Sequence, residues 1–250
     1  VPFLSFISKL IGNFLPYNFH YFSIWIFTCF TLHIFFSYKI IFFLTKKINF
    51  SFISTLFFLF TPILFQTLKV HLSLGAHWII IAFIYLEIKF NIKNRIFLKT
   101  ILIVLSSLIH FYFTIMILIM NFVFSISHYF EFKNKSYAIK ENLFPLLFLI
   151  LTMYMVGYFS IPASDSLGFG YGYYKANLLT FFDPSSGFGY QNWSLFLPDI
   201  DNAKGEFEGY GYLGLGIIIL FFILLFYILK NLQYSIRNNY KYIVLSIFLF

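Results

Sequence analysis

Charged residues are scarce in this sequence. Asp, Glu, Lys and Arg make up only 10% of its 250 residues, whereas soluble domains carry about 25%. Hydrophobic residues account for 60%, and the stretch 22–44 contains a single charged side chain, Lys39. About 20 apolar residues cross a bilayer. The composition therefore excludes an ordinary soluble domain and predicts an integral membrane protein.

Cysteine is almost absent as well. The one cysteine, Cys29, lies in an apolar run, which excludes an internal disulfide and a cysteine-based metal site. The N-terminus has no charged segment followed by a small-residue cleavage site, so no signal peptide is predicted. The sequence begins at Val1 and ends within the apolar run 242–250, too short to cross a membrane. We therefore expect a fragment of a longer protein.

The apolar runs predict an all-α integral membrane fold. We expect a polytopic helical bundle of about six to eight membrane segments, one of them re-entrant, with one long external loop. The expected parts are an interfacial helix at 1–16, membrane helices within 22–161, an external loop at 163–210, and membrane helices at 212–250, the last one truncated. The individual spans are predicted at 22–44, 50–65, 73–88, 101–130, 143–161 and 212–229.

Basic residues orient these spans. Lysine and arginine favour cytoplasmic connections, and the connecting segments hold Lys46, Lys47, Lys89, Lys93, Arg95, Lys99, Lys133, Lys135, Lys140, Lys230, Arg237 and Lys241. By contrast, residues 163–210 contain more acids than bases, which places that loop outside. The same pattern accounts for the net charge of +8, so we expect no nucleic-acid partner.

The run 101–130 is flanked by basic segments on both sides. A helix of about 30 residues is roughly 45 Å long, too long for one upright crossing and too short for two. We therefore predict that it enters the membrane and returns, with the bend at Ile109-His110-Phe111-Tyr112. A single tilted helix is the alternative, and it would reverse the side of every later loop.

Five short motifs follow one another in a specific order. They are Pro2-Phe-Leu-Ser-Phe-Ile-Ser-Lys-Leu-Ile-Gly, Tyr21-Phe-Ser-Ile-Trp with Cys29-Phe, His71-Leu-Ser-Leu-Gly-Ala-His-Trp, Ile109-His-Phe-Tyr, and Asn177-Leu-Leu with Pro184, Ser194 and Glu208-Gly-Tyr-Gly-Tyr-Leu-Gly-Leu-Gly. In this order they resemble the glycosyltransferase C superfamily. In particular, they resemble a bacterial branch related to the polyprenol-phosphate-sugar-dependent transferases, although Phe111 replaces the usual proline of the bend.

The resemblance implies a multi-pass enzyme of the bacterial cytoplasmic (inner) membrane. Such an enzyme transfers a sugar from a polyprenyl-phosphate carrier to an extracytoplasmic acceptor, by direct displacement at the anomeric carbon, and its partners are membrane lipid and the polyprenyl-phosphate-linked sugar. The superfamily carries its catalytic carboxylate in the first external loop, ahead of the helix that Pro2 begins. We therefore expect that carboxylate upstream of Val1 and assign no catalytic residue here.

The candidate substrate-binding residues lie at the predicted external ends of the spans. They are Lys69, His71, His77, His110, Tyr112, Asn177, Ser194, Glu208 and Tyr212. Cations and imidazoles suit a phosphate group, but Lys69 and Trp78 also fit interfacial anchoring. Alternatively, the side chains of His110 and Tyr112 form hydrogen bonds with backbone groups that lose their helical partners at the bend. Because no carboxylate accompanies the two histidines at a metal-binding spacing, we expect neither a metal nor a cofactor.

Two other functional classes stay open. A polytopic transporter or flippase would have a similar number of spans, but such proteins carry ionisable groups inside their helices. Of the acidic residues, only Glu87, Glu131 and Glu141 lie outside the external loop. We therefore consider the spans too poor in charge for ion coupling. A non-catalytic membrane assembly subunit is the second alternative.

Overall fold

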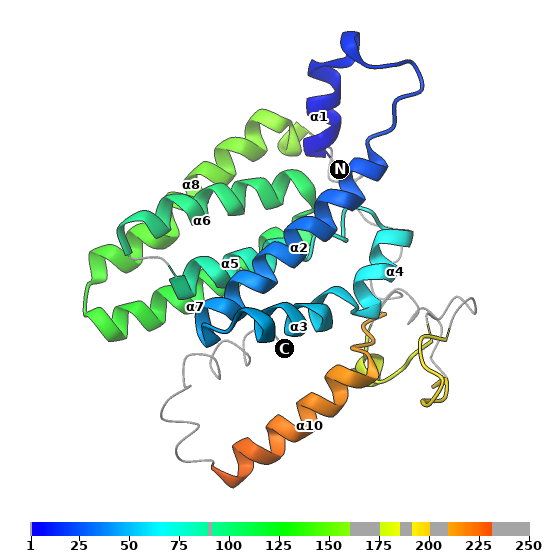
Figure 1. The fold of residues 1–250 in the computed structure, drawn as a ribbon. Helices are drawn as coiled ribbons and strands as arrows, with labels where there is room; N and C mark the ends of the chain where they lie inside the picture. The colour runs from blue at the N-terminus through cyan, green and yellow to red at the C-terminus, as the bar shows by residue number, and fades with distance from the viewer. Residues whose placement is uncertain (1, 90–91, 161–175, 186–191, 201–209, 232–250) are drawn as a thin grey trace.

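The computed structural model describes residues 2–89, 92–160, 176–185, 192–200 and 210–231, and this part of the chain is helical (Figure 1). The α-helices are α1 (Pro2–Leu10), α2 (Phe22–Thr45), α3 (Ile48–Leu59), α4 (Pro62–Val70), α5 (Trp78–Lys89), α6 (Ile92–Ile109), α7 (Phe111–Phe132), α8 (Lys135–Val156) and α10 (Leu215–Lys230). Short 3₁₀ turns cover Gly12–Phe14, Tyr158–Ser160 and Leu178–Phe181. The predicted all-α class is confirmed for these residues.

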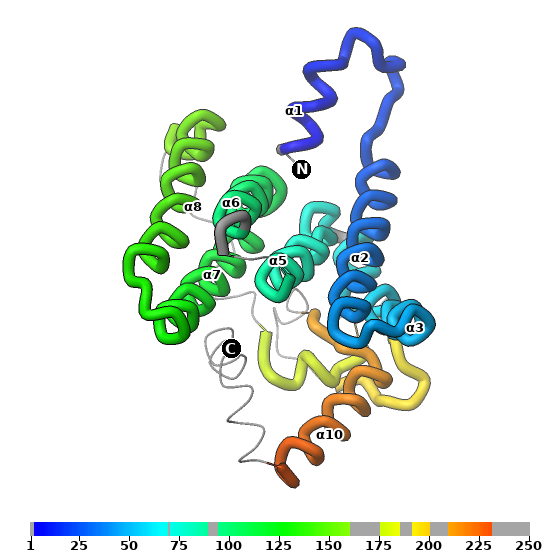
Figure 2. The backbone as a smooth tube through the Cα atoms, turned by 60° about the vertical axis from the view of Figure 1, so that its left-hand side comes forward, coloured from blue at the N-terminus to red at the C-terminus, as the bar shows by residue number. Residues whose placement is uncertain are grey.

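Helices α2 to α8 pack into one bundle with two distinct ends (Figures 1 and 2). Helices α2, α5 and α7 finish at the end on the left of Figure 1, which we call the lysine-rich end because Lys46, Lys89 and Lys133 lie there. The break between α6 and α7 and the start of α5 lie at the opposite end, which we call the histidine end.

Three of the described helices are long and apolar enough to cross a membrane, namely α2, α7 and α8. The pair α3 and α4 passes the same test together but bends by 48°. Apolar side chains on α8 face outward, and only 17% of its most apolar window is buried. Helices of this kind bury their backbone hydrogen bonds internally and expose greasy surface, as a bilayer requires. The chain is therefore a membrane protein, and the number of six to eight segments stays a prediction.

The predicted span at 50–65 is not one straight helix, because the chain bends before Pro62, and a single crossing by the bent pair α3 and α4 stays a prediction. Proline lacks a backbone N–H and disfavours helical geometry in the residue before it. Thr61 is accordingly extended, with ψ at 126°, and Pro62 starts the new helix α4. Proline is well tolerated at such a first position because that N–H would have no helical partner.

The predicted span at 73–88 begins too early. Helix α5 starts at Trp78, and the segment before it forms a tight turn over the end of α4. A larger residue in place of Gly75 would force Leu68 to move, since a Cβ there would lie 2.2 Å from a side-chain carbon of Leu68. Trp78 is 5% exposed and stacks on Phe36, with ring centroids 6.2 Å apart. Its expected place in an interfacial aromatic belt is therefore wrong.

The predicted bend at Ile109–Tyr112 is confirmed, and the alternative of one tilted helix is wrong. Helix α6 ends at Ile109 and α7 begins at Phe111. His110 is extended and caps α7, because its Nδ1 accepts the Tyr112 backbone N–H at 3.2 Å. However, α6 begins at Ile92 and not at residue 101. The two helices therefore form a hairpin of 18 and 22 residues, longer than the run of 101–130 predicted.

Two further helix boundaries lie at glycine residues with positive φ. Helix α8 starts earlier than predicted, at Lys135, and ends before Gly157, whose φ is +84°. Helix α10 follows Gly214, whose φ is +88° and whose Cα faces the Pro62 ring. The run 242–250 and most of the loop at 163–210 lie outside the described residues, so their predicted roles stay predictions.

Candidate functional site

A cluster of ionisable side chains is buried inside the bundle near its lysine-rich end. Four helices contribute to it: α5, α6, α7 and α8. Its members are Glu87, Arg95, Lys99, His128 and Glu141, and all are at most 8% exposed. We refer to these residues as the charge cluster. Ionisable groups at such depth in a membrane protein are rare and mark candidate functional sites.

Lys99 lies at the centre of the charge cluster. Its Nζ donates to Glu141 Oε1 at 2.7 Å and also forms an ion pair with Glu87. Arg95, one helical turn earlier on α6, lies 3.2 Å from the Glu87 carboxylate and 3.8 Å from that of Glu141. Residues four apart share one helix face. Arg95 and Lys99 therefore bring two cations to the same pair of carboxylates.

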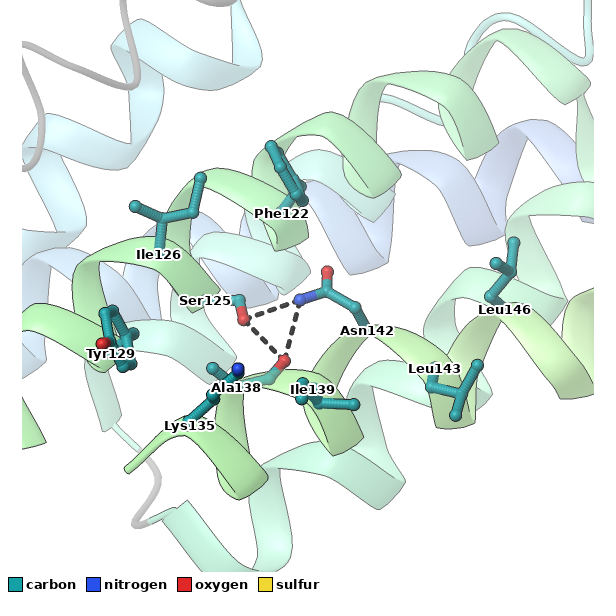
Figure 3. A pocket seen from close by; sticks show the side chains of 10 residues that line it. All are labelled: Phe122, Ser125, Ile126, Tyr129, Lys135, Ala138, Ile139, Asn142, Leu143 and Leu146. Carbon is teal, nitrogen blue, oxygen red and sulfur yellow. Dashed lines mark hydrogen bonds between the residues drawn. The ribbon is translucent and has the colours of Figure 1, made fainter. Parts of the chain in front are cut away.

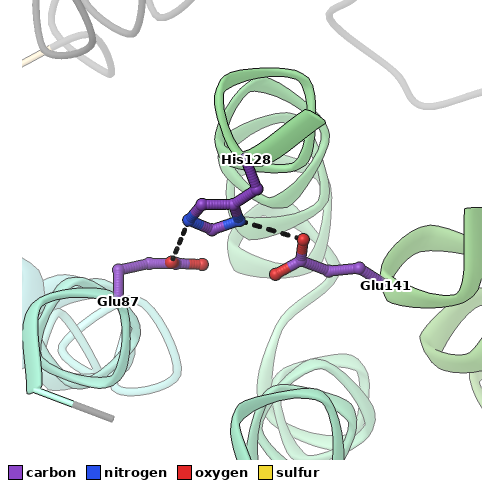
Figure 4. Close-up of side chains that lie close together, drawn as sticks. All are labelled: Glu87, His128 and Glu141. Carbon is purple, nitrogen blue, oxygen red and sulfur yellow. Dashed lines mark hydrogen bonds and ion pairs between the residues drawn. The ribbon is translucent and has the colours of Figure 1, made fainter. Parts of the chain in front are cut away.

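His128 of α7 lies between the two carboxylates (Figure 4). Its Nδ1 lies 3.0 Å from Glu141 Oε2 and 3.3 Å from a guanidinium nitrogen of Arg95, and its Nε2 lies 3.7 Å from Glu87 Oε2. One possible ligand atom from each of Glu87, His128 and Glu141 lies within 4.8 Å of the other two, a spacing that could hold a metal ion.

The charge balance argues against a divalent metal at this place. Two carboxylates are already matched by the Arg95 guanidinium and the Lys99 ammonium, so the cluster is neutral while His128 is neutral. An added divalent ion would leave two excess positive charges in a low-dielectric interior. The donor set therefore fits a closed ion-pair network that ties four helices together.

A polar seam continues the charge cluster along α7 and α8. Pro145 is inside α8 and has no N–H to donate to the carbonyl of Glu141, four residues earlier. Asn121 Nδ2 donates to that carbonyl instead, at 3.0 Å, and also to Asn142 Oδ1 at 3.1 Å. A side chain of α7 thus replaces the backbone bond that proline removes from α8.

The histidine end brings together three of the predicted site residues. The rings of His77 and His110 both pack against Phe113, with centroids 6.0 Å and 6.4 Å from it. His71 lies within electrostatic range of His110. Because His71 and His77 flank one turn and His110 caps α7, the local structures already described place these imidazoles at one end of the bundle.

The His77 imidazole is held in its neutral form. Burial lowers its pKa to about 4, and the nearby His33 ring adds to this effect. At neutral pH it is therefore a hydrogen-bonding group and not a cation. His33 itself is buried, and its Nε2 lies 2.9 Å from the Phe58 carbonyl oxygen.

The other predicted site residues are spread over several environments. Lys69 is exposed in the last turn of α4, and Tyr112 is 64% exposed. Asn177 Oδ1 accepts the Leu179 N–H at 2.7 Å, and Ser194 Oγ accepts the Leu197 N–H at 3.0 Å. These oxygens stabilise local turns. Two further candidates differ again: the Tyr212 ring is buried, at 1% exposure, and Glu208 lies outside the described residues.

The sequence-based interpretation missed the charge cluster. It placed Arg95 and Lys99 in an exposed cytoplasmic connection, and this is wrong because both lie inside α6 at 5% and 0% exposure. The expectation that the spans are too poor in charge for ion coupling is therefore also wrong. One signal was present: Glu87 and Glu141 each interrupt or border an apolar run, as buried charges with partners do.

The fold and this arrangement define an all-helical membrane protein whose bundle is closed at one end by buried ion pairs. The chain belongs to the family described as a domain of unknown function, DUF6311, and the match covers residues 1–250. No curated protein and no solved structure matches the chain.

Proposed function

We propose that this protein is a glycosyltransferase-like protein of the bacterial cytoplasmic membrane. It transfers a sugar from a polyprenyl-phosphate carrier to an extracytoplasmic acceptor of the cell envelope, as in the glycosyltransferase C superfamily that its motifs resemble. The observation that carries the proposal is the gathering of His71, His77 and His110 at the histidine end. These residues come from two separate motifs of that resemblance.

The chemistry of this end suits a carrier lipid with a phosphate group. The neutral imidazole of His77 donates a hydrogen bond to a phosphate oxygen or sugar hydroxyl without the desolvation cost of a buried charge. Lys69, which is exposed in the last turn of α4 just before His71, supplies a cation for the phosphate. Phe113 and Tyr112 add apolar surface beside them. The role of proton acceptor for the acceptor hydroxyl is assigned to none of the described residues.

Sugar transfer tests this proposal directly. The full-length protein in liposomes is supplied with a radiolabelled polyprenyl-phosphate sugar, and transfer to an envelope acceptor is measured for wild type and His77→Gln. We expect at least a tenfold loss of transfer, because a hydrogen bond that positions substrate is removed. The matched control is His20→Gln, an exposed histidine outside the group. Equal transfer by wild type and both variants would reject the site.

A proton-coupled transporter is the second candidate, and the charge cluster is the observation that favours it. An imidazole between two carboxylates inside a bundle is an arrangement that proton relays use. It ranks second because every carboxylate of the cluster already has a cationic partner. Proton uptake into liposomes that contain the protein separates the candidates: uptake lost in His128→Gln, with no sugar transfer by wild type, would favour the transporter.

A further inference from the structure

An outward-facing groove runs between α7 and α8 (Figure 3). Its volume is about 600 Å³. One wall is a stripe of α7 at helical spacing, and the other is a stripe of α8. The groove is lined by Phe122, Ser125, Ile126, Tyr129, Lys135, Ala138, Ile139, Asn142, Leu143 and Leu146.

The polar atoms in the floor of this groove are already paired with one another. Asn142 Nδ2 donates to Ser125 Oγ at 2.6 Å and to the Ala138 carbonyl at 2.9 Å, as the dashed lines in Figure 3 show. Ser125 Oγ donates to the same carbonyl at 2.9 Å. Because these groups need no further partner, the floor favours an apolar occupant over a polar one.

The groove is polar at one end and apolar along its length. Lys135, in the first turn of α8, and Tyr129 lie at the lysine-rich end, while Leu143 and Leu146 lie deeper along the helix. No acidic side chain is among the residues that line it. Among the described residues, Lys135 has no carboxylate within ion-pair distance.

The length of the groove matches one leaflet of a bilayer. From Lys135 to Leu146 the α8 backbone rises by roughly 16 Å at 1.5 Å per residue. Half of the hydrocarbon core of a bilayer is about 15 Å thick. The groove thus has a cation at the membrane surface and an apolar wall as long as one leaflet is thick. A phospholipid has the same layout, with its phosphate at the membrane surface and its acyl chain in the hydrocarbon core.

We propose that the α7–α8 groove binds an acidic glycerophospholipid from the leaflet at the lysine-rich end. Lys135 contacts the lipid phosphate, and one acyl chain lies along Ile139, Leu143 and Leu146. This site is separate from the histidine end, and it does not depend on the proposed sugar transfer.

Native mass spectrometry of the purified full chain tests the proposal. The protein is titrated with phosphatidylglycerol or phosphatidylcholine in mild detergent, and the occupancy of the first bound lipid is measured. We expect preference for phosphatidylglycerol, and a roughly fivefold weaker affinity for it in Lys135→Gln, the size expected for one lysine near anionic lipid. Lys47→Gln is the matched control, since it removes an exposed lysine that lies at the same end and outside the groove.

A second variant tests where the acyl chain of the lipid lies. Leu143 is 57% exposed, so Leu143→Trp fills the groove without disturbing the bundle interior, and we expect it to lower the occupancy of phosphatidylglycerol. A photo-crosslinking residue at Leu146 should yield an adduct with the mass of one phospholipid. Equal affinities of wild type, Lys135→Gln and Lys47→Gln, or an adduct with a second copy of the chain, would overturn the proposal.

Discussion

The two ends of the helix bundle hold their ionisable side chains in opposite ways. At the lysine-rich end, Glu87, Arg95, Lys99 and Glu141 are buried, and each charge has a partner of opposite sign. At the histidine end, His77 packs against an aromatic ring and is neutral. Balanced charges in a dry interior hold helices in register, whereas uncharged imidazoles near a turn keep hydrogen-bonding capacity for a ligand.

If the lysine-rich end holds the helices together and the histidine end binds a ligand, substitutions at the two ends should change different properties of the protein. Buried ion pairs are weak evidence for stability in themselves, but removal of one partner leaves the other charge buried without compensation. Substitutions in the charge cluster should therefore act mainly on stability. Substitutions at the histidine end should act mainly on transfer.

The largest effect is expected for Glu141→Gln. It removes a carboxylate from Lys99, Arg95 and His128 and leaves the charge cluster with an excess positive charge. The expected loss in the free energy of unfolding is about 3–5 kcal/mol, measured by denaturation in detergent micelles. In Glu131→Gln, at an exposed position of α7, the loss should stay below about 1 kcal/mol.

A double variant sharpens this test. Lys99→Met combined with Glu141→Gln removes both charges of one pair, so it should recover a large part of the lost stability, as replacement of buried ion pairs by apolar groups often does. A double variant as unstable as the sum of the two single variants would show that Lys99 and Glu141 act independently, contrary to the ion-pair network.

The next effect concerns pH and the histidine end. The pKa of His77 is about 4 in the folded protein, against 6.5 for an unperturbed histidine. The unfolded chain therefore binds the proton more readily between these values, so the contribution of His77 to stability is intact above pH 6.5 and falls as the pH drops to 4. The total change is about 3 kcal/mol.

Subtraction isolates this contribution from that of other titrating groups. The difference in free energy of unfolding between wild type and His77→Gln should change by about 3 kcal/mol from pH 7 to pH 4. His20→Gln, which replaces an exposed histidine, is measured over the same pH range as the control. A difference for His77→Gln that does not change with pH would contradict the lowered pKa of His77.

A smaller effect is expected at the polar seam. Asn121→Ala leaves the Glu141 carbonyl without a donor, since Pro145 cannot supply one. The expected destabilisation is about 1–2 kcal/mol, measured in the same micelles. Pro145→Ala restores the backbone N–H, so the loss caused by Asn121→Ala should shrink in that background. An unchanged loss would mean that the two residues do not compensate each other.

Local signals in the sequence were sufficient to predict much of the fold. Hydropathy located α2 to within one residue, and the polar His110 between two apolar runs indicated the break that the structure has. The break before Pro62 was missed because the apolar character continues across it, although proline geometry offered the signal. The start of α6 was missed because its basic residues were counted as a loop.

The charge cluster was out of reach for a different reason. Lys99 and Glu141 are 42 residues apart, and Arg95 and His128 are 33 apart. A charged residue near the end of an apolar run looks the same in sequence whether it faces water or pairs with a distant helix. Only the packing of α5 to α8 distinguishes these cases. At the histidine end, by contrast, the break at His110 was visible locally. His71 and His77 were predicted from a motif of the resemblance, although part of the turn between them was assigned to a span.

The most direct test of the account is the side of the membrane on which each end lies. In a Cys29→Ser background, single cysteines replace Leu178, which is 74% exposed near the start of α10, and Ile48, which is 64% exposed at the lysine-rich end. Intact cells are treated with a membrane-impermeant maleimide. The account predicts labelling of Leu178→Cys, and labelling of Ile48→Cys only after lysis. Labelling of Ile48→Cys in intact cells, with Leu178→Cys protected, would contradict it.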